Sequence, residues 1–120
     1  MTGAPLLDRP FIADLFDGIG AEGARSVIEL FIRESAAYLA RIAEAAARPD
    51  DADRREEARR AAHSFRSGAG QVGATAAAAA ALAVERAAAA NSPDLGQRIA
   101  ELHACTAATI PALQALPSEK

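Results

Sequence analysis

The chain has 120 residues, of which 51% are hydrophobic but only 4% aromatic, and a formal net charge of −3. This length suits one domain with a single core, and the lack of a positive net charge argues against nucleic acid as the main partner. The longest uncharged apolar stretch, residues 72–84, is shorter than the roughly 20 residues that a membrane helix needs. With one cysteine and no secretion signal, the sequence predicts a cytoplasmic protein that does not enter the membrane.

The first half of the chain predicts three helices. Asp8 can cap a short leading helix, which Gly18 and Gly20 should end. Apolar residues three or four apart then predict a long amphipathic helix over residues 21–48, stopped by Pro49. Asp50 and Asp51 can cap the next helix, which should run to about residue 70.

The second half predicts two more helices. Residues 74–90 are almost all strong helix formers, and the turn residues 91–94 should lead into a last helix that ends near Pro117. Pro111 lies inside that last pattern, so the sequence leaves open whether the helix bends there or ends early. The predicted fold is all-α: one domain over residues 1–120, with a core of about residues 8–116. It is an antiparallel four-helix bundle with a short additional N-terminal helix.

His63 is the residue in this pattern that can carry chemistry. It lies opposite the apolar stripe of its helix and beside Arg59 and Arg66, so we expect an accessible imidazole on a locally basic face. Two nearby guanidinium groups favour the neutral, nucleophilic ring and would stabilise a phosphoryl group attached to it. The stripe predicted to face the core consists of Ala58, Ala61, Ala62, Phe65, Ala69 and Val72.

Three glycines follow His63, although each glycine inside a helix costs about 1 kcal/mol relative to alanine. Gly70 lies on the face of His63 and would leave a flat notch where another protein can approach the ring. Gly68 and Gly73 can serve the same purpose, or they can be a helix cap and a close contact between helices.

Residues 62–74 read Ala-His-Ser-Phe-Arg-Ser-Gly-Ala-Gly-Gln-Val-Gly-Ala. This segment resembles the signature of histidine-containing phosphotransfer domains, roughly His-x-Leu-Lys-Gly, small residues, an aliphatic residue and Gly-Ala. Phe65 takes the leucine position and Arg66 the lysine, while Glu85 matches a Leu-x-x-Glu in the family's next helix. Ser67 in place of the first glycine, and arginine in place of lysine, predict an altered choice of partner.

The resemblance implies that His63 accepts a phosphoryl group from, or donates it to, an aspartate of a partner protein. The expected partners are a response-regulator receiver domain, a hybrid sensor histidine kinase, or both. The chain would be a phosphocarrier rather than a turnover enzyme, with no cofactor or metal of its own, since the receiver holds the magnesium ion. Arg59, Arg66 and Gln71 would dock the partner and balance charge. Ser67 could hydrogen-bond the ring or the phosphoryl oxygens.

Three other readings compete with this prediction: a receiver-binding adaptor without phosphoryl transfer, the phosphoacceptor domain of a chemotaxis-type histidine kinase, and a structural bundle that dimerises. Residues 68–73 also fit the dinucleotide-binding pattern G-x-G-x-x-G, but that pattern requires a preceding buried strand and here follows a helix. His103 is expected to be a packed histidine at the edge of the last helix's apolar stripe. The two histidines and one cysteine lack the spacing of a metal site.

Overall fold

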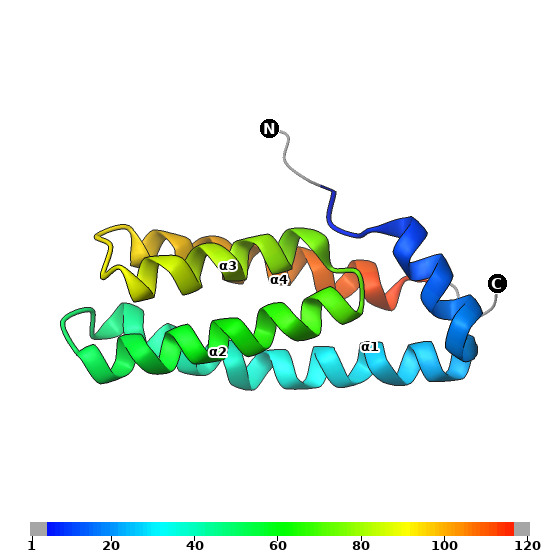
Figure 1. Cartoon of the computed structure of the whole chain (residues 1–120), viewed down its shortest axis with the longest axis horizontal. Coiled ribbons are helices and arrows are strands. Elements are labelled where there is room, and N and C mark those ends of the chain that lie inside the picture. The colour runs from blue at the N-terminus through cyan, green and yellow to red at the C-terminus, as the bar shows by residue number, and fades with distance from the viewer. Residues whose placement is uncertain (1–4, 117–120) are drawn as a thin grey trace.

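The structure, a computed structural model, describes residues 5–116 and has four helices: α1 (Arg9–Ala47), α2 (Ala52–Gln71), α3 (Thr75–Ala89) and α4 (Leu95–Gln114). Successive helices run in opposite directions and lie side by side as an antiparallel bundle (Figure 1). Residues 5–116 contain no strand, which confirms the predicted all-α class. None of the described helices is long and apolar enough to cross a lipid bilayer.

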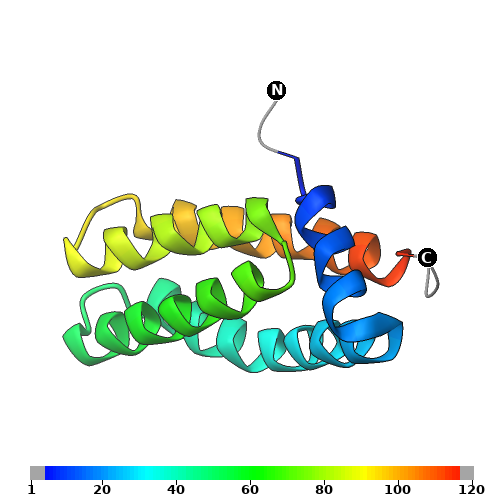
Figure 2. The same ribbon diagram turned by 45° about the vertical axis from the view of Figure 1, so that its right-hand side comes forward.

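The helix α1 bends sharply at Gly20, so that its first arm crosses one end of the bundle (Figures 1 and 2). It begins as predicted at Asp8, whose side chain accepts a hydrogen bond from the Phe11 backbone N–H at 3.1 Å. Gly20 alone leaves the helical conformation, with φ +83° and ψ 163°, and the helix resumes at once. The predicted leading helix is therefore not a separate element, because one glycine turns the axis without ending the helix.

The arm is joined to the turn between α2 and α3 at Gly73. This residue has φ +73° and follows the end of α2, where the Ala74 N–H donates to the Ala69 carbonyl and the Gly73 N–H to the Gly70 carbonyl. This is the paired hydrogen bonding of a Schellman cap. The Asp8 backbone N–H donates to the Gly73 carbonyl at 2.8 Å. The sequence left open whether Gly73 is a helix cap or a close contact between helices, and the structure shows that it is the helix cap.

The remaining helix ends follow the predicted signals with small shifts. Asp51 caps α2, its side chain accepting from the backbone N–H groups of Asp53 and Arg54. The last helix begins at Leu95 and continues through Pro111 as far as Gln114. Pro111 therefore neither starts nor ends the helix, and the early end near Ile110 that the sequence allowed does not occur.

Alanine is the commonest residue of the buried core, and the alanines of α2 and α3 let these two helices approach closely. The aromatic contact in it is an edge-to-face pair of Phe31 and Phe65, with ring centroids 5.4 Å apart. A Cβ atom at Gly68 would lie 3.3 Å from the Phe31 ring, so this glycine forms a close contact between α1 and α2. The whole stripe predicted to face the core is buried: Ala58, Ala61, Ala62, Phe65, Ala69 and Val72.

Replacing Gly73 with alanine is expected to lower the free energy of unfolding by roughly 1–3 kcal/mol. The new side chain would hold a left-handed backbone conformation, and its Cβ would lie 2.9 Å from Ile12 Cγ1. Urea denaturation followed by circular dichroism measures the change. Gly96→Ala is the control, because a Cβ there meets nothing within 4 Å. It should leave stability unchanged or raise it by up to about 1 kcal/mol. Equal stabilities of the two variants would contradict this account of Gly73.

Candidate functional site

His63 lies in the middle of α2 on the side turned away from the core. Its side chain is 58% exposed, whereas Ala62, directly before it, and Phe65, two residues after it, are fully buried. Consecutive helix residues point about 100° apart, so a residue one place beyond a buried position can face the solvent. The predicted exposure of the imidazole is confirmed.

A carboxylate from the neighbouring helix contacts the ring. Glu85, on α3, places Oε2 2.8 Å from Nδ1 of His63, and its Oε1 accepts a hydrogen bond from Nε of Arg66 at 2.9 Å. The Glu85 side chain is only 15% exposed. One partly buried carboxylate therefore holds two α2 side chains that lie one turn apart.

These contacts decide which ring nitrogen of His63 carries a hydrogen. Nδ1 also lies 3.2 Å from Nη2 of Arg66, but a guanidinium group has only donors, whereas a carboxylate has only acceptors. If Nδ1 carried no hydrogen, its lone pair would face a lone pair of the Glu85 carboxylate at 2.8 Å, which is repulsive. The contact is a hydrogen bond only when Nδ1–H donates to Glu85. In the neutral ring the lone pair is then on Nε2, which has no hydrogen-bond partner within residues 5–116.

The charge on Glu85 is stabilised by the two residues that it binds. Burial by itself would raise the pKa of Glu85, but the hydrogen bonds from Arg66 and His63, together with the positive charge of Arg66, outweigh burial and lower it. The carboxylate is therefore ionised at neutral pH and available as an acceptor for both.

The basic face predicted around His63 is less basic than the sequence suggests. Arg59 makes a two-pronged ion pair with Glu56, with Nε to Oε1 at 2.9 Å and Nη2 to Oε2 at 2.7 Å. Hydrogen bonds from Arg59 and then Arg60 lower the pKa of Glu56 to about 2, and the same contact with Glu56 raises the pKa of Arg59. Since Arg66 is paired with Glu85, each predicted arginine has a carboxylate partner.

The other predicted site residues lie on the same surface but do not bind the ring. Ser67 and Gln71 are exposed, and neither hydrogen-bonds His63 among the described residues. Gly70 is exposed, and a Cβ built there would meet nothing within 4 Å. The backbone at Gly70 is thus open to solvent, as the notch interpretation requires.

Two carboxylates of the site, Glu85 and Glu56, are not predicted by the sequence. Glu85 has a signal in the sequence, because it occupies the glutamate position of a Leu-x-x-Glu motif, but that motif does not show what the carboxylate binds. Glu56 lies three residues before Arg59, a spacing at which helical side chains meet, and that spacing could have identified the ion pair.

Several features lie outside this site. His103 is exposed on α4, where its Nδ1 lies 3.2 Å from the Ile99 carbonyl, so the prediction of a packed histidine is wrong. The glycine pattern at residues 68–73 forms the last turn of α2 and its cap, not the strand-to-helix turn of a dinucleotide site. Within residues 5–116, no group of three or more His, Cys, Asp or Glu side chains is placed to hold a metal ion.

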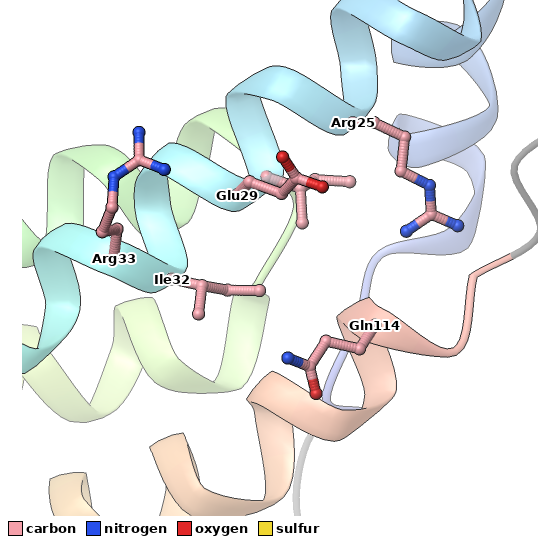
Figure 3. A pocket seen from close by; sticks show the side chains of 6 residues that line it. Arg25, Glu29, Ile32, Arg33 and Gln114 are labelled. Atoms are coloured by element: carbon pink, nitrogen blue, oxygen red, sulfur yellow. The ribbon is translucent and has the colours of Figure 1, made fainter.

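An open groove of about 420 Å³ lies between α1 and α4 (Figure 3). Arg25 reaches from α1 towards α4, where its Nη1 lies 3.5 Å from the Leu113 carbonyl. No residue of α2 or α3 lines the groove, so it is separate from the surface around His63. Its lining residues are Arg25, Ile28, Glu29, Ile32, Arg33 and Gln114.

Comparison with known proteins agrees with this architecture. Residues 26–115, which are 90 of the 120 residues, match the Hpt domain family. The chain therefore belongs to the Hpt family of phosphotransfer domains, as its resemblance in residues 62–74 predicted. No curated protein of matching sequence was found.

A solved structure shares the fold. The crystal structure of histidine-containing phosphotransfer protein B (HptB) from Pseudomonas aeruginosa PAO1 superposes with a TM-score of 0.79. The alignment covers 93% of this chain and 94% of that one, at 23% sequence identity. At this level of identity the likeness concerns the fold alone.

Replacing Glu85 with glutamine is expected to lower the free energy of unfolding at pH 7 by about 1 kcal/mol, because Arg66 loses a charged acceptor. The pKa of Glu85 is lower in the folded chain than its ordinary value of 4.5. Its contribution to stability is therefore complete above pH 4.5 and is lost as the pH falls through the folded-state pKa. Urea denaturation between pH 3 and pH 7 should show the wild type and Glu85→Gln converging in acid. A constant difference across that range would contradict the ion pair.

Proposed function

We propose that His63 is the phosphoacceptor of this Hpt domain and carries a phosphoryl group between aspartates of receiver domains. The observation that carries the proposal is the exposed imidazole whose Nδ1 is bound to Glu85 at 2.8 Å. This contact orients the ring and leaves the lone pair of Nε2 facing outwards, as a nucleophile requires.

The proposed step transfers one phosphoryl group without a change in total charge. The lone pair of Nε2 attacks the phosphorus of an aspartyl phosphate and forms an N–P bond. The P–O bond to the aspartyl oxygen breaks, and its electrons remain on the aspartate as a carboxylate. The ring keeps its Nδ1 hydrogen and becomes a phospho-imidazolium, whose positive charge is stabilised by Glu85.

The domain contributes position and charge to this step. Phosphoryl transfer has little covalent assistance from the protein, so the rate depends on holding the two reactants in line and on stabilising the transferred charge. Arg66 is one turn from His63 and its Nη2 is 3.2 Å from Nδ1, so its positive charge lies beside the ring that would carry the phosphoryl group. The magnesium ion would belong to the receiver domain.

The proposed partners are a response-regulator receiver domain, a hybrid sensor histidine kinase, or both, in the cytoplasm. The exposed face formed by Ser67, Gly70 and Gln71 along α2 would meet the partner. Open backbone at Gly70 supports this surface, because a partner loop can approach there without meeting a side chain.

Mixing the protein with a phosphorylated receiver domain should label it with phosphate that is acid-labile and base-stable. His63→Gln should abolish the label, whereas His103→Gln, which removes the other exposed histidine, should keep it. Radiolabel transfer followed on gels measures both. Wild-type protein that binds several phosphorylated receivers but stays unlabelled would contradict phosphoryl transfer and favour an adaptor.

Replacing Gly70 with leucine should slow transfer from a receiver domain roughly tenfold, because the side chain would hold the partner away from the ring. Its melting temperature should not fall, since a Cβ at this position meets nothing within 4 Å. Labelling by a small phosphodonor such as phosphoramidate serves as the control and should be unchanged. A large fall in melting temperature would instead identify Gly70 as a packing residue.

A further inference from the structure

Two arginines within about one turn of His63 on α2, Arg59 and Arg66, are held by carboxylates of different burial. Arg66 is paired with Glu85, whose side chain is 15% exposed and which also binds His63. Arg59 is paired with Glu56, whose side chain is 43% exposed. An ion pair in contact with solvent exchanges partners easily, because water screens its attraction and solvates both groups when they separate.

The spacing along α2 allows Arg59 to serve either neighbour. Glu56 lies three residues before Arg59 and His63 lies four residues after it, and both intervals place side chains on adjoining turns of one helix face. In this structure the guanidinium group is bound to Glu56, and within residues 5–116 it makes no hydrogen bond to the ring of His63. Glu56, and more weakly Glu85, raises the pKa of Arg59, so the Arg59 guanidinium lies within electrostatic range of the carboxylate that binds His63.

The Glu56 carboxylate would keep a positively charged partner if Arg59 moved away. Arg60 donates from Nε to Oε2 of Glu56 at 3.1 Å, so a second guanidinium group is already bound to the same carboxylate. The two arginines together keep the pKa of Glu56 at about 2, and the carboxylate is therefore ionised at any physiological pH.

We propose that Glu56 is a positioning residue that holds Arg59 away from the unphosphorylated His63, and that Arg59 moves to the phosphoryl oxygens when His63 is phosphorylated. This inference rests on the proposed function. Because Arg59 must give up Glu56 to bind the phosphoryl group, Glu56 reduces the stabilisation of phosphohistidine. It therefore favours passing the group on to the next aspartate.

The test is the equilibrium of phosphoryl transfer between a receiver aspartate and His63. Glu56→Gln should shift this equilibrium about two- to five-fold towards phosphohistidine, the effect expected for loss of an exposed ion pair. Glu57→Gln is the matched control: it removes the same charge from the adjacent position, where Glu57 pairs with Arg54 at 3.4 Å. This control should behave like the wild type.

A double-mutant cycle shows whether Glu56 acts through Arg59. Arg59→Gln should shift the equilibrium away from phosphohistidine, and adding Glu56→Gln to it should change nothing further. Unchanged melting temperatures would show that all variants are folded. The inference is overturned if Glu57→Gln has the same effect as Glu56→Gln, or if the Glu56→Gln effect persists without Arg59.

The outcomes also separate this inference from the proposed function. If wild-type His63 is labelled and Glu56→Gln has the wild-type equilibrium constant, only the role of Glu56 is wrong. If wild-type protein takes no phosphoryl group from any receiver, the proposed function fails and the role of Glu56 fails with it.

Discussion

The contact of Glu85 with both His63 and Arg66 depends on how closely α2 and α3 approach each other. A glutamate side chain is short, so it can reach two residues of a neighbouring helix only when the side chains between the two helices are small and the helices pack closely. Alanines supply such surfaces on both helices, including Ala62 beside His63 and Ala81 on α3, both fully buried. The alanine-rich, aromatic-poor composition is therefore a condition for the site as well as for the fold.

Charge around the imidazole is balanced rather than simply positive. Each arginine within a turn of His63 on α2 has a carboxylate partner, but the two partners differ in burial. Arg66 is bound to the same carboxylate that orients the ring, so it belongs to the fixed part of the site. Arg59 is bound to an exposed carboxylate, which makes it the cation more easily transferred to a phosphoryl group. In the proposed mechanism this difference gives Arg59 and Arg66, which lie seven residues apart on α2, separate roles.

Three glycines within six residues have three different surroundings. Gly68 faces the Phe31 ring, Gly70 faces open solvent, and Gly73 holds a left-handed conformation beneath the first arm of α1. Their spacing alone could not distinguish these roles, because the groups that surround Gly68 and Gly73 come from α1, some 40 to 60 residues earlier in the chain. Glycine spacing also matches the dinucleotide-binding motif G-x-G-x-x-G, although the strand that this motif requires before it is a helix here.

The sequence by itself determined the features that depend on one helix: the caps at Asp8 and Asp51, the buried stripe of α2, and the exposure of His63. These follow from the fixed rotation per residue and from local hydrogen bonds. The sequence placed Gly20 and Pro111 as possible helix ends, but it did not decide that α1 resumes directly after Gly20 or that α4 continues to Gln114. Tertiary structure alone brought Glu85 to His63 across 22 residues of sequence and so selected the ring nitrogen left free. Helix geometry sets spacing within a helix, but only packing sets which residues of two helices meet.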